Sequence, residues 1–168
     1  MLRKFGIIAV LALLVTAFAA VPALAVDPIS ITRDGGLHFQ GTPTVTADKS
    51  GDTATLTADA NVAGAGETAS ATLTADATLT AGCINRGAKG QEPSGLQTTT
   101  TPVVGTETVN TRQGRASFDV DATASIPADF TCPDRMQETL VSANFTNVTL
   151  TVTSQTGTTT AFFPDIDP

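Results

Sequence analysis

The chain has 168 residues, of which 41% are hydrophobic, with a formal net charge of −7 and neither Trp nor Tyr. A chain of this length forms one ordinary domain, alone or with a tail. Its acidic balance disfavours nucleic acid as a partner, because a phosphate backbone attracts basic surfaces. It also lacks the Trp and Tyr side chains that sugar-binding sites and tight protein interfaces commonly use.

The first 25 residues have the pattern of a secretory signal peptide. Arg3 and Lys4 precede an apolar run over residues 7–20, and Ala23-Leu24-Ala25 supplies the small residues of a cleavage site. The apolar run is shorter than the roughly 20 residues of a membrane-spanning helix. We therefore predict cleavage after Ala25, secretion to the extracellular space, and no stable membrane insertion of the mature chain. Cleavage removes two of the nine basic residues and none of the sixteen acidic ones, which leaves a net charge of −9.

The segment from Thr68 to Cys83 alternates between small apolar residues and Thr, Ser, Asp or Gly. Strict period-two alternation is typical of a strand with one buried face. Residues 53–62 alternate in the same way, and the heptapeptide ATLTADA occurs at 54–60 and again at 71–77. A solenoid would show at least three such copies, so we interpret the Gly-rich link 64–67 as the turn of a β-hairpin.

Further strands are predicted at 37–46, 98–109, 116–122 and 138–153, with a last short strand ending near Phe163. Pro102 makes the second of these an edge strand or a bent one. In the longest, the apolar parity changes between Phe145 and Val148, which predicts a bulge or bend at Thr146-Asn147.

These elements predict an all-β domain. About seven strands with frequent turn signals, and no helical periodicity after the signal, are typical of an immunoglobulin-like antiparallel β-sandwich, with a β-barrel as the alternative. The predicted organisation is a signal peptide (1–25), an N-terminal extension (26–35), the sandwich domain (36–163) and a C-terminal tail (164–168).

The two cysteines, Cys83 and Cys132, are predicted to form a disulfide, as cysteine pairs of exported proteins usually do. Closing a loop of this length stabilises a fold by about 4 kcal/mol. That matters here because most inward positions are Ala, which buries little apolar area. The alternative is a catalytic or metal-binding thiol pair, but the spacing is not C-x-x-C and His38 is the only histidine.

No motif of a serine hydrolase, zinc protease or P-loop protein is present, so we predict a protein that is not an enzyme and has no cofactor. The carboxylate pairs Asp119/Asp121 and Asp165/Asp167 leave calcium binding open, although the sequence supplies few of the six or more oxygens required. One alternative function is a secreted hydrolase that uses loop carboxylates; the candidates are Asp129, Asp134 and Glu138.

The loop over residues 83–95 is Gly-rich and carries two cations in an acidic protein. Its candidate binding residues are Asn85, Arg86 and Lys89, because binding sites on a rigid sandwich usually lie in loops. The other interpretation, which we favour, is a solvated crossover between the sheets.

Outward T-x-T pairs on several strands resemble the surface of β-type ice-binding proteins, which gives a second alternative, a surface- or ice-adsorbing protein. Against a flat lattice stands the normal twist of sheets, about 20–25° per strand. The threonines concerned are Thr53, Thr55, Thr57, Thr72, Thr74, Thr78, Thr80, Thr149, Thr151 and Thr153.

The signal, the Thr/Ala/Val-rich strands, the segment Gly82-Cys83-Ile84-Asn85, the pair Cys132-Pro133 and the stretch 145–152 together resemble a group of small secreted proteins of high-GC Gram-positive bacteria, of unassigned function. The resemblance covers residues 36–153. It implies a two-cysteine β-sandwich and no activity. The leading hypothesis is a secreted, non-catalytic module, either an interaction domain or an envelope-associated structural protein, whose partner is extracellular or part of the cell envelope.

Overall fold

The computed structural model describes residues 24–87 and 92–168, and within these ranges it contains nine strands and no helix. The predicted signal peptide therefore lies outside the described residues except for Leu24 and Ala25. The strands are β1 (Ser30–Gly35), β2 (His38–Phe39), β3 (Thr44–Ser50), β4 (Thr53–Ala63), β5 (Thr68–Asn85), β6 (Ser94–Asn110), β7 (Arg115–Ser125), β8 (Met136–Ser154) and β9 (Gly157–Phe162).

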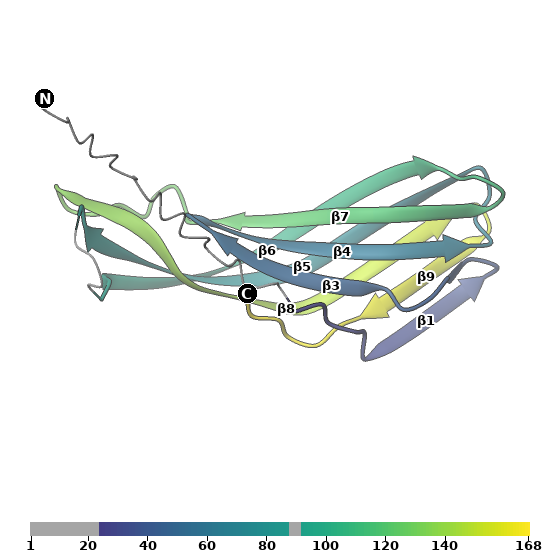
Figure 1. Ribbon diagram of the computed structural model, residues 1–168, viewed down its shortest axis with the longest axis horizontal. Coiled ribbons are helices and arrows are strands. Elements are labelled where there is room, and N and C mark those ends of the chain that lie inside the picture. Colours follow the sequence, from purple (N-terminus) through teal and green to yellow (C-terminus); the bar gives the residue numbers. More distant parts are fainter. Residues whose placement is uncertain (1–23, 88–91) are drawn as a thin grey trace, which may run out of the picture.

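The strands form two antiparallel sheets that lie face to face, which confirms the predicted β-sandwich (Figure 1). The larger sheet has the order β1-β9-β8-β5-β6. In the smaller sheet, β4 pairs with β7 along one side and with β3 and β2 along the other.

The core lies between the two sheets and is built by the alternation of the strands. Along β5 every odd residue from Ala69 to Cys83 is buried, while the threonines between them are half-buried or exposed. The opposite sheet contributes the matching buried rows of β4 and β7. The largest fully buried side chains are Phe145, Leu37, Leu56, Leu73, Leu79 and Leu150.

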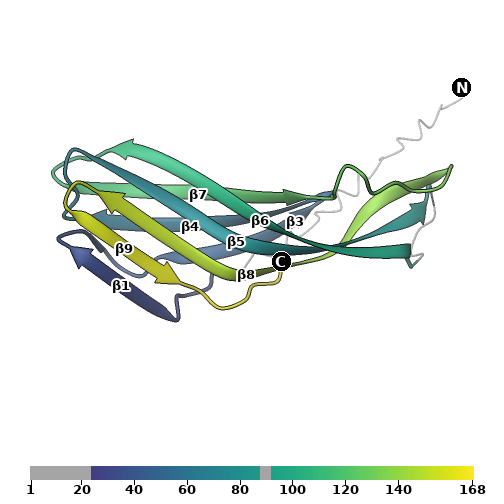
Figure 2. The ribbon, with the colours of Figure 1, turned by 180° about the vertical axis from the view of Figure 1, so that it is seen from behind.

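Strands β5, β6 and β8 have 17 to 19 residues, whereas β4 and β7 have 11 each. The three long strands therefore run on past the end of the smaller sheet as a twisted arm (Figures 1 and 2). At the other end of the sandwich, the links β1–β2, β4–β5, β6–β7 and β8–β9 lie together. We call this the loop end.

The parity change in β8 is a bulge, as predicted. Thr74 of β5 pairs with Thr149, but Asp76 pairs with Thr146, so two residues of β8 face one residue of β5. Asn147 adopts a positive φ of 54° at this point, and its side-chain amide donates a 2.8 Å hydrogen bond to the Asp76 carboxylate. Asn tolerates this backbone region better than most residues, which suits it to the bulge.

The predicted hairpin between residues 53–62 and 68–83 is wrong. Strand β4 belongs to the smaller sheet and β5 to the larger one, so the link 64–67 crosses between sheets instead of joining paired strands. The apolar faces of both strands point into the same core from opposite sides, and Leu56 and Leu73 are both fully buried there. The alternation of apolar and polar residues is the same for two paired strands and for two strands that face each other across a core, so it could not distinguish the two arrangements.

Both ends of the described chain are more ordered than predicted. Within the predicted N-terminal extension, Ser30–Gly35 forms the edge strand β1, and Val26 pairs with Val45 of β3. The predicted C-terminal tail continues beside β8 after β9 ends. There Ile166 is buried and exchanges two 2.9 Å backbone hydrogen bonds with Phe145.

One side of the sandwich is closed by a close approach of β6 to β7. A Cβ atom added to Gly105 would lie 2.1 Å from the backbone oxygen of Asp121. Next to it, the Glu107 carboxylate accepts a 2.9 Å hydrogen bond from the backbone N–H of Asp119. Only glycine allows this approach, because the obstacle is backbone.

We expect Gly105→Ala to lower the free energy of unfolding by about 1–3 kcal/mol, since an overpacked site must move backbone apart. Gly36→Ala is the control: it also has no positive φ, and its added Cβ would meet nothing closer than 3.9 Å. Denaturant unfolding of both variants checks the difference. Equal midpoints would contradict the close approach of β6 and β7.

Candidate functional site

The outer face of the larger sheet carries threonine in register across all five strands. One row runs through Thr32, Thr160, Thr151, Thr72 and Thr106, each residue directly paired with the next. Neighbouring strands lie about 4.8 Å apart, so this row is roughly 19 Å wide. No short sequence motif encodes it, because the five residues come from five separate strands.

The rows on either side consist mostly of Thr and Ser, but one ends in Asp34 and the other includes the exposed apolar residues Phe162 and Val104. One contains Asp34, Thr158, Thr153, Ser70 and Thr108, and the other Ser30, Phe162, Thr149, Thr74 and Val104. The pairs Thr78–Thr100 and Thr80–Thr98 extend the pattern along the arm. We call these rows and pairs the threonine face.

Many hydroxyl groups of this face bond to one another across strands. The hydroxyl oxygens of Thr74 and Thr149 are 2.6 Å apart. In five other pairs the two hydroxyl oxygens are 2.9 to 3.5 Å apart: Thr78–Thr100, Thr80–Thr98, Thr151–Thr160, Thr108–Ser70 and Thr158–Thr153. A hydroxyl that already donates within the face has less need of water. The face is therefore less hydrophilic than its composition indicates, and the cross-strand bonds restrain its side chains.

The threonine face is also nearly uncharged in an acidic protein. Among the described residues on this side of the sheet, the carboxylates are Asp34 at its edge, Asp76 beside the bulge and Asp167 beside Asn144, the partner of Thr78. Asn147 donates a hydrogen bond to Asp76, and Asn144 donates one to Asp167. The outer face of the smaller sheet differs: it carries Asp48, Asp59, Asp119 and Asp121, and Asp59 lies directly opposite Asp119.

The T-x-T residues predicted from the sequence divide between the two sheets. Those of β5 and β8 share the threonine face, whereas Thr53, Thr55 and Thr57 of β4 lie on the opposite side of the molecule. Figures 1 and 2 show that the larger sheet is strongly twisted, so its rows do not form one plane. The array is wider than the sequence indicated, but it is not a flat lattice.

The loop over residues 83–95 joins neighbouring strands of the same sheet, so its interpretation as a crossover is wrong. Asn85 ends β5, and the backbone N–H of Arg86 donates a 3.3 Å hydrogen bond to the Arg135 carbonyl. Lys89 lies outside the described residues. Of the three candidate binding residues, the structure therefore places two at the tip of the arm.

A hollow of about 580 Å³ lies at this tip and is lined by Arg86, Asp52 and Glu138 among others. Of the three loop carboxylates predicted for a hydrolase, only Glu138 lines this hollow. Asp129 lines a separate, much smaller hollow beside Phe130, and Asp134 is exposed in the turn before β8. The described lining of this hollow therefore has one cation and two carboxylates.

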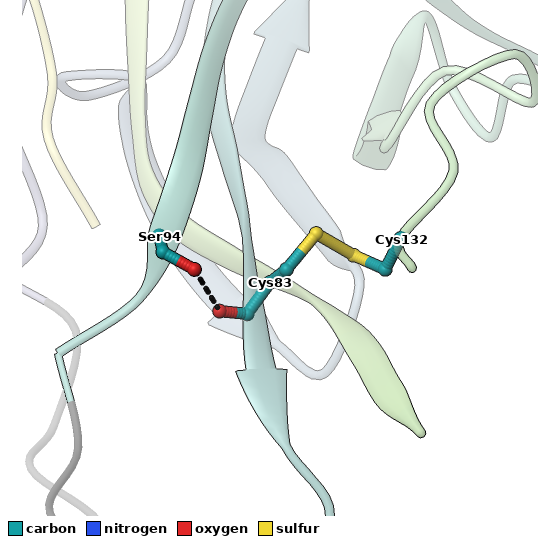
Figure 3. Close-up of a disulfide and its surroundings, with 3 residues drawn as sticks. All are labelled: Cys83, Ser94 and Cys132. Carbon is teal, nitrogen blue, oxygen red and sulfur yellow. Dashed lines mark hydrogen bonds between the residues drawn. A yellow bond between two sulfur atoms is a disulfide. The ribbon is translucent and has the colours of Figure 1, made fainter. Parts of the chain in front are cut away.

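The Cys83–Cys132 disulfide is formed as predicted (Figure 3), and it is typical of an oxidising, extracellular-type environment. It joins β5 to the segment 126–135, which runs under the arm where the smaller sheet has ended. Phe130 of that segment is buried against Ala81 and Cys83 in a core cluster of its own. The segment thus covers an apolar surface that no strand covers.

The remaining chemistry-bearing residues are accounted for by local contacts. Within residues 24–87 and 92–168, no group of three or more His, Cys, Asp or Glu side chains is arranged to hold a metal. Asp121 accepts a 2.6 Å hydrogen bond from Thr57, and Asp167 accepts one from Asn144. His38 lies in β2, half-buried, and its Nδ1 is 3.0 Å from the Gly36 carbonyl oxygen.

Comparisons with protein-family models, with curated proteins and with solved structures find no match for this chain. The chemistry of its own surfaces is what supports a function. Of the surfaces described above, the threonine face is the one that is extended, internally hydrogen-bonded and nearly free of charge.

We expect Cys83→Ser with Cys132→Ser to lower the free energy of unfolding by up to about 4 kcal/mol, the loop-closure value for a separation of 49 residues. The arm should open first, because segment 126–135 is held there by Phe130 and the disulfide. Limited proteolysis should therefore cut within 126–135 in the variant and not in the oxidised protein. An unchanged cleavage pattern together with an unchanged unfolding midpoint would contradict this role.

Proposed function

We propose that the protein is a secreted, non-catalytic adhesion module that binds an extended, uncharged surface of the cell envelope through its threonine face. The observation that carries this proposal is the in-register threonine row across five strands, on a face with almost no charge. A surface of this width and shape lacks the enclosure of a small-molecule site. Its neutrality matters because an acidic chain approaches a partner most easily where its own charge is lowest.

A non-catalytic role is supported by where the carboxylates lie. Asp129 and Glu138 border different hollows, so the structure does not bring these two predicted carboxylates together. The predicted signal peptide and the disulfide both favour a protein that works outside the cell. We do not favour ice as the surface, because the twist of the larger sheet prevents its threonines from matching a flat lattice.

Thr74→Lys tests the proposal by placing a long cation in the middle of the threonine face. Purified protein is mixed with washed envelopes of the producing cells, and pellet and supernatant are compared by immunoblot. We expect saturable pelleting of the unaltered protein and at least roughly tenfold weaker pelleting of Thr74→Lys, since a desolvated unpaired charge costs well over 1.4 kcal/mol.

Thr55→Lys is the matched control. Thr74 and Thr55 are both half-buried and lie on strands that are paired on both sides. Each hydroxyl has one partner on a neighbouring strand: Thr149 at 2.6 Å for Thr74, and Thr123 at 3.1 Å for Thr55. Pelleting of this variant should match the unaltered protein. Equal loss in both variants, or no pelleting of the unaltered protein, would overturn the proposal.

A further inference from the structure

The loop end of the sandwich contains a hollow of about 410 Å³ that is lined by two arginines and no carboxylate. The arginines are Arg112 and Arg115, and the polar residues around them are Gln40, Asn61, Asn110 and Ser117. The sequence has nine basic residues against sixteen acidic ones, so two cations in one hollow without an acidic neighbour stand out. The hollow at the arm tip, in contrast, pairs Arg86 with Asp52 and Glu138.

The two arginines are held side by side by the turn between β6 and β7. Each backbone N–H donates to the other's carbonyl, at 2.9 and 3.0 Å, across the turn residues Gln113 and Gly114. Both turn residues have positive φ, 53° and 71°, as a two-residue hairpin turn requires. Directly opposed residues of an antiparallel pair share a face, with Cβ atoms about 5 Å apart.

The turn is also fixed to the rest of the loop end. The backbone N–H of Ala65 donates a 3.0 Å hydrogen bond to the Gly114 carbonyl, and the backbone N–H of Thr111 donates a 2.9 Å hydrogen bond to the backbone carbonyl of Glu67. The two arginines are therefore presented by a backbone that is bonded on both sides.

This arrangement has an electrostatic cost that the described residues do not offset. Like charges directly opposite each other destabilise a strand pair, and neither guanidinium has an ion-pair or hydrogen-bond partner in the described part of the chain. Asn61 accepts a 2.6 Å hydrogen bond from Ser117 at its Oδ1, which leaves its amide N–H groups as donors. The hollow is thus rich in donors and in positive charge.

We propose that this hollow binds an acidic saccharide, with Arg112 and Arg115 holding its carboxylate and the amide side chains holding its hydroxyl groups. Guanidinium groups match a carboxylate through two parallel N–H···O bonds. The amides of Gln40, Asn61 and Asn110 can both donate to and accept from sugar hydroxyls. A hollow of about 410 Å³ accommodates a sugar ring in addition to its acid group. This site is separate from the threonine face and does not depend on it.

Isothermal titration of the purified protein with trigalacturonate tests the proposal, with maltotriose as the neutral probe and inorganic phosphate as the bare anion. We expect binding of trigalacturonate alone. Arg112→Gln with Arg115→Gln should weaken it at least roughly tenfold, because each charged hydrogen bond is worth about 1.5–3 kcal/mol. Arg112→Lys with Arg115→Lys, which keeps the charge but not the paired donors, should give an intermediate affinity.

Arg33→Gln with Arg135→Gln is the control, because it removes the same charge from exposed positions outside the hollow. Circular dichroism and thermal unfolding establish that each variant is folded before titration. Equal weakening in both double variants would reduce the effect to overall charge, and equal binding of phosphate would reduce the site to one for a free anion. Either result, or no binding of trigalacturonate, would overturn the proposal.

Discussion

Strand β5 is hydrogen-bonded on both sides over nearly its whole length, to β6 and to β8, and most other features depend on this pairing. Its odd residues from Ala69 to Cys83 are buried in the core, its even residues up to Thr80 lie on the outer face, and Cys83 near its end forms the disulfide. A shift of one residue in register would exchange the core row with the threonine row. The burial of Leu73 and Leu79 fixes the register, and the bulge at Asn147 restores it where β8 has one residue too many.

Alanine is the commonest residue of the core, so the fold requires additional stabilising contacts where only one sheet is present. Alanine buries little apolar area, so each strand pair gains little from side-chain burial. Within the sandwich, Phe145 and a few leucines add the apolar area that alanine lacks, and each sheet covers the inner face of the other. On the arm there is only one sheet. There Phe130 and the disulfide replace the missing second layer, and Lys49 of β3 reaches across to donate a 2.8 Å hydrogen bond to the Val141 carbonyl.

The sequence predicted what each strand buries better than which strand it pairs with. Alternation over 53–62 and 68–83 identified the buried rows correctly, yet it could not distinguish two paired strands from two strands stacked across a core. In the C-terminal segment the pairing was missed for a different reason, because the segment has no alternating pattern. Pro and Asp dominate residues 164–168, and the single Ile166 gives no periodic signal, so its pairing with Phe145 was not predictable.

The candidate sites also depend on contacts between strands that are far apart in the sequence. Each T-x-T pair indicated an outward face, but the five-residue threonine row exists only because β1 and β9 pair beside β8. Arg112 and Arg115 flank the turn residues Gln113 and Gly114. Their hollow forms only where β2 and β4 bring Gln40 and Asn61 to that turn, and no local pattern in the sequence encodes this meeting.

The outer faces of the two sheets differ in charge. The carboxylates of the smaller sheet lie on its outer side, and stacked sheets are about 10 Å apart. At physiological ionic strength the screening length is about 8 Å, so these carboxylates act only weakly at the threonine face. A partner that meets the threonine face therefore encounters hydroxyl and methyl groups, not the negative charge of the whole chain. Approach from the opposite side meets Asp59 and Asp119 directly, and an uncharged partner there would have to desolvate these carboxylates without pairing them, which disfavours that side.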